Sequence, residues 1–178
     1  MIKEIDKSEI AECVNVIRKS FKTVADELGF TVENAPYHTA FATTEEKLLN
    51  QLEYEHRLMV AFYDDGNGKI QGYYSLQYLE NSECELSNLC VLPEFRHKKI
   101  GEALIEDAFA RAKSNNCTKM KISIVEENKV LRKWYEAHGF IHTHTIKYDF
   151  FPFTQVFLQF SREIPPFGVS IYHSKEGT

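Results

Sequence analysis

The chain has 178 residues, with 26 acidic and 21 basic side chains and a formal net charge of −5. This length predicts one domain, and a hydrophobic content of 43% is enough to build a core. The acidic balance argues against a nucleic-acid-binding protein, and no apolar run is long enough to cross a membrane. The N-terminus mixes charges of both signs, and four widely spaced cysteines without a CxxC pair are typical of reduced thiols. We therefore expect a cytoplasmic protein.

Hydrophobic periodicity predicts alternating strands and helices along most of the chain. A capping-box signature at Thr43–Glu46 marks the start of the second helix, and the Asp64–Gly68 turn predicts a hairpin. In chain order we expect a strand at 2–5, a helix from Asp6 or Ser8 to 21, a helix at 43–52, strands at 57–63, 70–79 and 84–91, a helix at 100–114, a strand at 119–125, a helix at 128–138, and strands at about 140–148 and 153–160.

This order predicts one α/β domain with a mixed sheet over residues 1–161, followed by a tail at 162–178 without a trusted pattern. The long segment from Asp26 to Phe41 is acidic and aromatic, and it fits either a binding loop or a packed connection. The residues expected on the inward face of the helix at 128–138 are Val130, Leu131, Trp134 and Tyr135.

The stretch from Leu89 to Leu104 carries the clearest functional signal. A strand ends at Val91, and a basic loop then leads to Gly101 and the start of a helix. Free N–H groups at a helix N-terminus attract anions, and a glycine lets a phosphate approach the backbone. Neither GxGxxG nor GxxxxGK[ST] occurs in the chain, which disfavours a Rossmann or P-loop site. We predict a di- or triphosphate ligand here, with a solvated basic loop as the alternative.

Two motifs in the same order resemble the GNAT superfamily of N-acetyltransferases. The run from Val91-Leu-Pro-Glu to Arg96-His-Lys-Lys-Ile-Gly101 is similar to the family's phosphate loop, [Q/R]-x-x-G-x-[G/A], with Lys99 in place of the first glycine. The family's later motif, N-x-x-A-x-x-x-Y-x-x-x-G-F, is matched in register by Asn128, Leu131, Tyr135, Gly139 and Phe140, with leucine in place of the alanine. The resemblance covers about residues 2–161.

The resemblance implies a GNAT-like α/β fold, in which about four helices flank a mixed, largely antiparallel twisted sheet of about six or seven strands. Its central parallel pair, the strand ending at Val91 and the strand at 119–125, would splay apart. Acetyl-CoA is the implied co-substrate, and no metal is implied. The implied cofactor-binding residues are Leu89, Cys90, Val91, Arg96, His97, Lys98, Lys99, Ile100, Gly101, Glu102 and Asn128.

The resemblance also implies a general acid, Tyr135, which would protonate the leaving thiolate. A phenol with a pKa of ~10 stays protonated at neutral pH, and the alternative role is core packing beside Trp134. A backbone N–H of the strand at 89–91 would polarise the thioester carbonyl.

Glu85 is the candidate base that would take a proton from the substrate ammonium. Strand alternation predicts that Glu85, Ser87, Leu89 and Val91 lie on one face. A salt-bridged or rim carboxylate is the alternative role for Glu85, and Glu83, Glu80 or a chain of waters are the alternative bases.

Cysteine and histidine invite two further hypotheses. Cys90 lies next to the expected reaction zone, but it falls on the strand face opposite Leu89 and no motif pairs it with a base. We expect it to be a small buried apolar residue. His142 and His144 are expected on one strand face without a further ligand at metal spacing, so surface histidines are favoured over a metal site.

We therefore expect an acetyl-CoA-dependent N-acetyltransferase that acts on a primary amine by direct attack in a ternary complex. The acceptor would be a small-molecule or peptide amine, and a cationic one fits the segment from Asp26 to Phe41. Nucleic acid and membranes are not expected partners, and a homodimer stays open. The alternatives are a non-catalytic CoA-binding or regulatory module on the same fold, or a structural domain without the cofactor.

Overall fold

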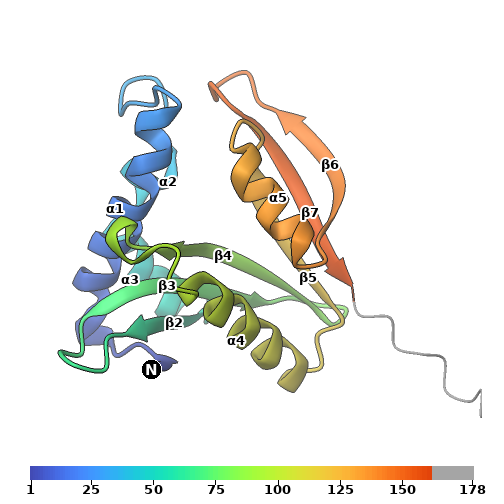
Figure 1. The fold of residues 1–178 in the computed structure, drawn as a ribbon. Helices are drawn as coiled ribbons and strands as arrows, with labels where there is room; N and C mark the ends of the chain where they lie inside the picture. Colours follow the sequence, from blue (N-terminus) through green and yellow to red (C-terminus); the bar gives the residue numbers. More distant parts are fainter. Residues whose placement is uncertain (162–178) are drawn as a thin grey trace, which may run out of the picture.

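In the computed structural model, which describes residues 1–161, seven strands form one sheet in the order β1-β2-β3-β4-β5-β7-β6 (Figure 1). All neighbouring strands are antiparallel except β4 and β5, which are parallel. The strands are β1 (Ile2–Glu4), β2 (Leu58–Tyr63), β3 (Ile70–Tyr78), β4 (Glu83–Val91), β5 (Lys119–Val125), β6 (Ile141–Lys147) and β7 (Thr154–Ser161). The predicted fold class is therefore confirmed. The expected tail at 162–178 lies outside the described residues.

Helices cover both faces of this sheet. The helices are α1 (Ile10–Glu27), α2 (Thr39–Ala42), α3 (Glu45–Glu53), α4 (Ile100–Ser114) and α5 (Lys129–Ala137), and short 3-10 turns span Lys7–Glu9 and Pro93–Phe95. α1 and α3 bury Ile17 and Leu48 against one face of β2, β3 and β4. α4 and α5 bury Leu104 and Tyr135 against the other face. The sequence did not predict the four-residue helix α2.

Asp6 caps the first turn as predicted, whereas one helix start and one helix face differ from the predictions. The capping box lies at the first turn, where Asp6 accepts from the Ser8 N–H at 2.9 Å and Glu9 accepts from the Asp6 N–H at 2.6 Å. The box expected at Thr43–Glu46 is wrong, because the N-cap of α3 is Thr44. Val130 was expected to point inward, but it lies in the first turn of α5 and is 81% exposed.

Gly72 on β3 lies in close contact with α4 and with the backbone of β4. A Cβ atom at this position would lie 2.9 Å from Leu104 Cδ1 and 3.0 Å from the Cys90 carbonyl oxygen. The second contact is with backbone, which cannot move without shifting β4. We expect Gly72→Ala to lower the free energy of unfolding by about 1–3 kcal/mol, which denaturant titration would measure. Gly101→Ala is the matched control, because its nearest contact would be an ordinary 3.6 Å; an equal loss of stability in both variants would contradict this account.

The feature that shapes the functional site is the separation of β4 from β5. The two strands pair only where Glu83, Cys84 and Glu85 face Lys119, Met120 and Lys121. Beyond Glu85 the edge of β4 that faces β5 has no strand partner, and the two strands diverge (Figure 1). The expected splayed parallel pair is therefore present.

A β-bulge interrupts β4 in the same region. Ser75 pairs with Ser87 and Tyr73 pairs with Cys90, so one residue of β3 opposes two residues of β4. Asn88, one of those two, has a φ of 55°. Because a bulge disrupts the ladder and leaves its extra residue unpaired, backbone groups of Asn88 and Leu89 are released from regular pairing at the splayed edge.

Candidate active site

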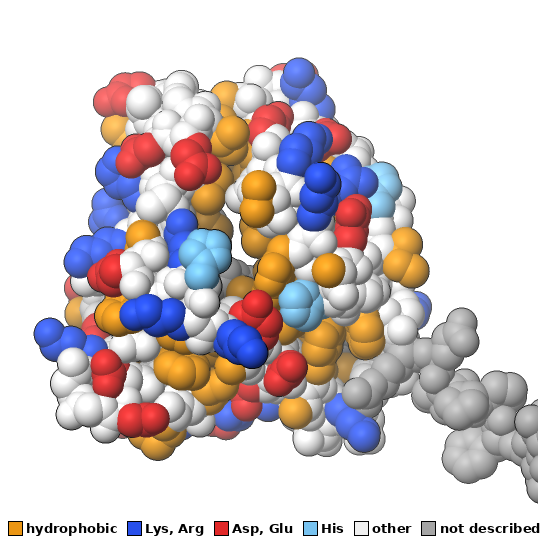
Figure 2. All heavy atoms as spheres, viewed as in Figure 1, with side chains coloured by type: hydrophobic (Ala, Val, Ile, Leu, Met, Phe, Trp, Pro, Cys, Tyr) orange, Lys and Arg blue, Asp and Glu red, His pale blue; other side chains and the backbone are white. Residues whose placement is uncertain are grey.

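The diverging ends of β4 and β5 enclose a pocket of about 250 Å³. β4 lines it with residues 85–89 and β5 with residues 122–125, while Asn128, Leu131 and Tyr135 approach from α5. The other end is formed by α1, by the start of α2 with the residues before it, and by the start of β7 with the connection that precedes it. The residues at that end are Phe21, Val24, Tyr37, His38, Thr39, Phe151, Phe153 and Gln155. The space-filling view shows this hollow between the two halves of the molecule (Figure 2).

Tyr135 presents its hydroxyl to this pocket from an otherwise buried position. The residue is only 5% exposed, and its ring meets Trp134 and Phe140 edge-on at centroid distances of 5.0 and 5.3 Å. The hydroxyl makes no hydrogen bond within residues 1–161 and is not among the sealed polar atoms there. Burial raises the pKa of Tyr135 above its ordinary value of 10.0, so the phenol keeps its proton at neutral pH. The site therefore contains an available proton donor.

Asn128 lies at the start of α5 and has two possible uses. Its side-chain oxygen accepts a hydrogen bond from the Leu131 N–H at 3.0 Å and so caps the helix. The residue lines the pocket, and its side-chain nitrogen has no hydrogen-bond partner in the described part of the chain. That nitrogen can donate to a bound molecule while the cap stays intact.

Glu85 reaches the pocket from the α1 side of the sheet. Ser87 Oγ donates to its carboxylate at 2.9 Å, and Arg57 Nη1 lies 3.7 Å away. The prediction that Glu85 shares a face with Leu89 and Val91 is wrong. The bulge adds one residue to β4 after Ser87. Side chains that follow the added residue therefore point to the opposite face from the one that regular alternation predicts. The pairing instead puts Glu85 and Ser87 on the same face as Cys90.

Cys90 is a core residue of that face. It packs in the apolar cluster formed by α1 and the sheet, and burial raises the pKa of its thiol to about 12. A thiol in this environment stays protonated and is a poor nucleophile.

The loop between β4 and α4 presents backbone N–H groups at a helix N-terminus. Lys99 is the N-cap of α4 and makes no side-chain cap, so the N–H groups of Ile100, Gly101 and Glu102 have no intrahelical acceptor. Lys99 and His97 both have a φ of 62°, in the left-handed region. The lysine that replaces the family's first loop glycine therefore adopts the conformation that glycine favours.

Three basic side chains of this loop have different surroundings. Arg96 donates to the Ser20 carbonyl and to Thr23 Oγ1, both at 2.9 Å, so its guanidinium attaches the loop to α1. Lys98 Nζ lies 5.0 Å from the ring centroid of Phe95. Lys98 and Lys99 are both exposed, which leaves their charges available to an anion at the helix start.

His38 is a candidate functional residue that no motif in the sequence indicates. It is 4% exposed, lines the pocket, and packs among the rings of Phe21, Phe30 and Phe153. Its Nδ1 accepts from the Ala40 N–H at 3.3 Å, which caps α2. Burial lowers the pKa of His38 below its ordinary value of 6.5, so the ring is neutral at physiological pH.

Acidic pH should destabilise the protein through His38. Above pH ~6.5 both the folded and the unfolded ring are neutral; below it the unfolded ring takes up a proton before the folded ring does, so the free energy of unfolding falls. Melting curves from about pH 8 to pH 5 should show a shallower acid-side fall for His38→Gln than for the unmodified protein. Identical slopes would mean that His38 is not held neutral by the fold.

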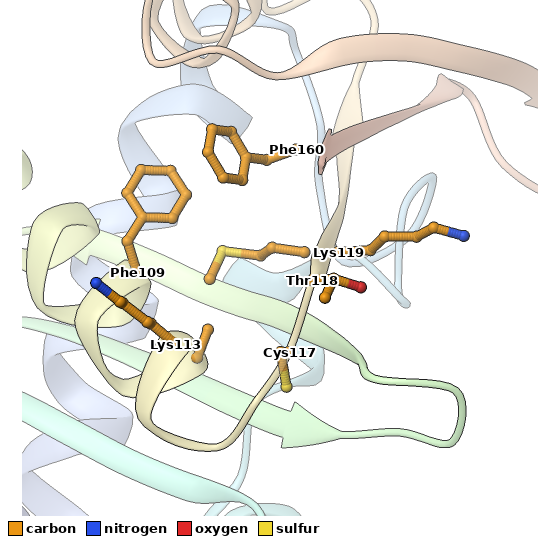
Figure 3. A pocket seen from close by; sticks show the side chains of 8 residues that line it. Phe109, Lys113, Cys117, Thr118, Lys119 and Phe160 are labelled. Carbon is orange, nitrogen blue, oxygen red and sulfur yellow. The ribbon is translucent and has the colours of Figure 1, made fainter. Parts of the chain in front are cut away.

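The rest of the described structure was compared with the requirements of three other features: a second ligand pocket, a metal site and a membrane-spanning helix. A hollow between α4 and β5 holds about 10 Å³, room for about one water, and Phe109 and Phe160 face each other beside it (Figure 3). Within residues 1–161 no group of three or more His, Cys, Asp or Glu side chains is placed to hold a metal ion. None of the described helices is both long and apolar enough to cross a membrane.

The prediction that His142 and His144 share a strand face is wrong. His142 pairs with Leu158 and His144 pairs with Phe157, so a bulge at Thr143 separates the two rings. His144 stacks on Phe157 with ring centroids 4.3 Å apart. The two histidines therefore lie on opposite faces of β6.

Comparison with known proteins identifies a matching family model and a relative of similar length. The model of the acetyltransferase (GNAT) family matches residues 25–140, more than half of the 178 residues. A spermidine N(1)-acetyltransferase of Thermoplasma acidophilum is 24% identical over 151 residues, which cover 84% of this chain and 92% of that protein.

Two solved structures share the fold. The PaiA N-acetyltransferase of Thermoplasma acidophilum, in complex with coenzyme A, superposes with a TM-score of 0.76 at 20% identity and covers 91% of this chain and 98% of its own. A ribosomal-protein alanine N-acetyltransferase of Escherichia coli gives a TM-score of 0.74 at 13% identity and covers 95% of this chain and 97% of its own. The arrangement of sheet and helices is thus shared over nearly the whole chain.

Proposed function

Because the chain belongs to the acetyltransferase (GNAT) family, we propose that it transfers the acetyl group of acetyl-CoA to a primary amine by direct attack in a ternary complex. The observation that carries the proposal is the pocket between the splayed β4 and β5, into which the protonated hydroxyl of Tyr135 opens. An acyl-cysteine route is disfavoured, because Cys90 lies in the core with a raised thiol pKa.

The residues around β4 fit the donor in three places. The unpaired edge of β4 near Leu89 and Val91 can take the amide groups of a pantetheine arm as an added strand would. Asn128 can donate its free side-chain nitrogen to the same arm. The N–H groups of Ile100, Gly101 and Glu102 are suited to the pyrophosphate, because a helix N-terminus favours anions.

The basic loop would assist this binding in two ways. Arg96 positions the loop through its hydrogen bonds to α1. The exposed side chains of His97, Lys98 and Lys99 surround the helix start, where a basic charge attracts phosphate.

Two groups of this chain would stabilise the transition state. A backbone N–H released by the bulge at Asn88 and Leu89 would donate to the thioester carbonyl oxygen as negative charge develops there. Tyr135 would donate its proton to the sulfur of the departing thiolate. The attacking nitrogen loses one proton as the amide forms, and this proton would restore the phenol of Tyr135. Before the attack, the substrate ammonium must also lose one proton to become the neutral amine.

Glu85 is the residue that we propose to receive this proton, directly or through water. It is the one carboxylate among the described pocket-lining residues, so it also attracts a cationic amine. Ser87 orients the carboxylate by its 2.9 Å hydrogen bond.

We also propose that residues 1–161 form one catalytic domain, which acts in the cytoplasm on a small-molecule or peptide amine. The names of the relatives suggest two acceptors to try first, spermidine and a peptide that begins with alanine.

Two measurements in sequence test this function. Acetyl-CoA should raise the melting temperature, because a ligand that binds only the folded state stabilises it. A panel of amines should then release free thiol from acetyl-CoA in step with N-acetylated product. Stabilisation without thiol release from any amine would favour the non-catalytic CoA-binding module instead. No stabilisation would contradict both functions.

A further inference from the structure

The acceptor end of the pocket contains a buried polar atom that the proposed reaction does not use, the Nε2 atom of His38. The ring is 4% exposed and lines the pocket. No hydrogen bond from a residue in 1–161 reaches Nε2, whereas Nδ1 is occupied by the Ala40 N–H at 3.3 Å. The described side-chain atoms that are sealed without a partner are Ser20 Oγ, Gln51 Oε1 and Tyr73 OH. Nε2 is not among them, so it keeps its access to the pocket.

The hydrogen bond at Nδ1 determines what Nε2 can do. A neutral imidazole has one N–H and one acceptor nitrogen. Because Nδ1 accepts from Ala40, the ring proton is on Nε2, and burial among phenylalanine rings favours this neutral form. His38 therefore offers the pocket a hydrogen-bond donor and cannot serve as a base in this state.

We propose that His38 selects acceptors that carry a hydrogen-bond-accepting oxygen beside the amine, such as the carbonyl of an amino acid amide or of a peptide N-terminus. This inference rests on the proposed function, because it concerns the acceptor of the same reaction. It distinguishes two classes of amine: aminoacyl compounds, which carry such an oxygen, and polyamines, which do not.

The chemistry of the pocket supports this choice. At neutral pH a polyamine presents only ammonium groups, which donate hydrogen bonds and cannot pair with an N–H donor. Seating one against His38 would leave a buried N–H without a partner, and sites built to hydrogen-bond a substrate reject analogues that lack the matching atom. The carboxylate of Glu85 and the oxygen of Ser87 remain for the amine itself.

Two substitutions separate the two nitrogens of the ring. His38→Asn keeps an oxygen near the Nδ1 position, where asparagine is a good N-cap, but it removes the donor at Nε2. His38→Gln extends an amide N–H toward the Nε2 position and gives up the cap. The two probes are alanine amide and 3-methylbutan-2-amine. The second is an alkylamine of similar size in which methyl groups replace the amide oxygen and nitrogen.

We expect His38→Asn to lower kcat/KM for alanine amide on the order of tenfold more than kcat/KM for the alkylamine. We expect His38→Gln to keep the preference for alanine amide but to melt at a lower temperature, because it loses the cap of α2. For each acceptor, kcat/KM of the variant is divided by kcat/KM of the unmodified protein, so the different basicities of the two amines cancel. Equal losses for both acceptors in His38→Asn, or an unmodified protein that prefers the alkylamine, would overturn the inference.

Calorimetric binding of both amines to the CoA-loaded protein keeps the inference separate from the proposed function. Tighter binding of alanine amide that is lost in His38→Asn, without any turnover, would support the role of His38 and contradict catalysis. Turnover of both amines without this preference would support catalysis and overturn the role of His38.

Discussion

Replacing Tyr135 with Phe should lower kcat by about 10²–10⁴-fold and leave KM for acetyl-CoA nearly unchanged. The substitution keeps the ring and its edge-on contacts with Trp134 and Phe140 but removes the proton that the phenol can give. Because that proton is needed only as the thiolate departs, the loss should appear in the transition state and not in cofactor binding. Steady-state kinetics with the best acceptor amine, together with single-turnover rates, would measure it.

Tyr54→Phe is the matched control, because Tyr54 is 75% exposed and does not line the pocket. It should turn over at the rate of the unmodified protein. A Tyr135→Phe protein that melts normally and works at full rate would mean that Tyr135 only packs in the core. A change confined to KM for acetyl-CoA would assign its hydroxyl to cofactor binding instead.

The second large effect is expected at the start of α4. A Cβ atom at Gly101 would project between Trp134 Cζ2, at 3.6 Å, and Val91 Cγ2, at 4.0 Å. The two further methyl groups of valine would obstruct the approach of a pyrophosphate to the adjacent N–H groups. Losing one hydrogen bond to a charged group costs ~1.5–3 kcal/mol, so Gly101→Val should weaken acetyl-CoA binding about 10- to 100-fold.

Isothermal calorimetry with acetyl-CoA would measure this change, and Gly101→Ala is its control. Alanine adds only the Cβ, at ordinary contact distances, and improves helix propensity. We therefore expect the alanine variant to fold at least as stably and to bind acetyl-CoA more tightly than the valine variant. A folded Gly101→Val protein with unchanged affinity would remove the helix start from the binding site.

The order of helices and strands could be predicted from the sequence because it rests on local patterns, whereas the gap between β4 and β5 was implied by the family resemblance. The helical spacing in α4 and the turn from Asp64 to Gly68 are examples, and both appear in the structure as expected. The motif around Gly101 likewise indicated an open helix N-terminus, which the structure contains.

The positions of individual strand side chains were less predictable, because each depends on an unbroken alternation of faces. The bulge at Asn88 moved Glu85 to the face of Cys90, and the bulge at Thr143 separated His142 from His144. Asparagine tolerates the left-handed backbone that Asn88 adopts. Most asparagines have ordinary backbone conformations, however, so the presence of an asparagine at this position did not predict the bulge.

Long-range contacts account for the remaining differences. Arg96 stays a predicted cofactor-binding residue, and its hydrogen bonds to Ser20 and Thr23, which no pattern predicted, depend on how α1 lies beside the loop. His38 is buried partly by Phe153, from a distant part of the chain. No local pattern contains these pairings, so the sequence indicated the aromatic segment but not the burial of its histidine.

In the proposed reaction an amine takes the acetyl group directly from acetyl-CoA in the pocket between β4 and β5. Initial rates of thiol release, measured while acetyl-CoA and the acceptor amine are both varied, test it most directly. A ternary complex predicts intersecting double-reciprocal lines, with one N-acetylated amine formed for each thiol released. Parallel lines, or thiol release at the same rate without an amine, would contradict the account.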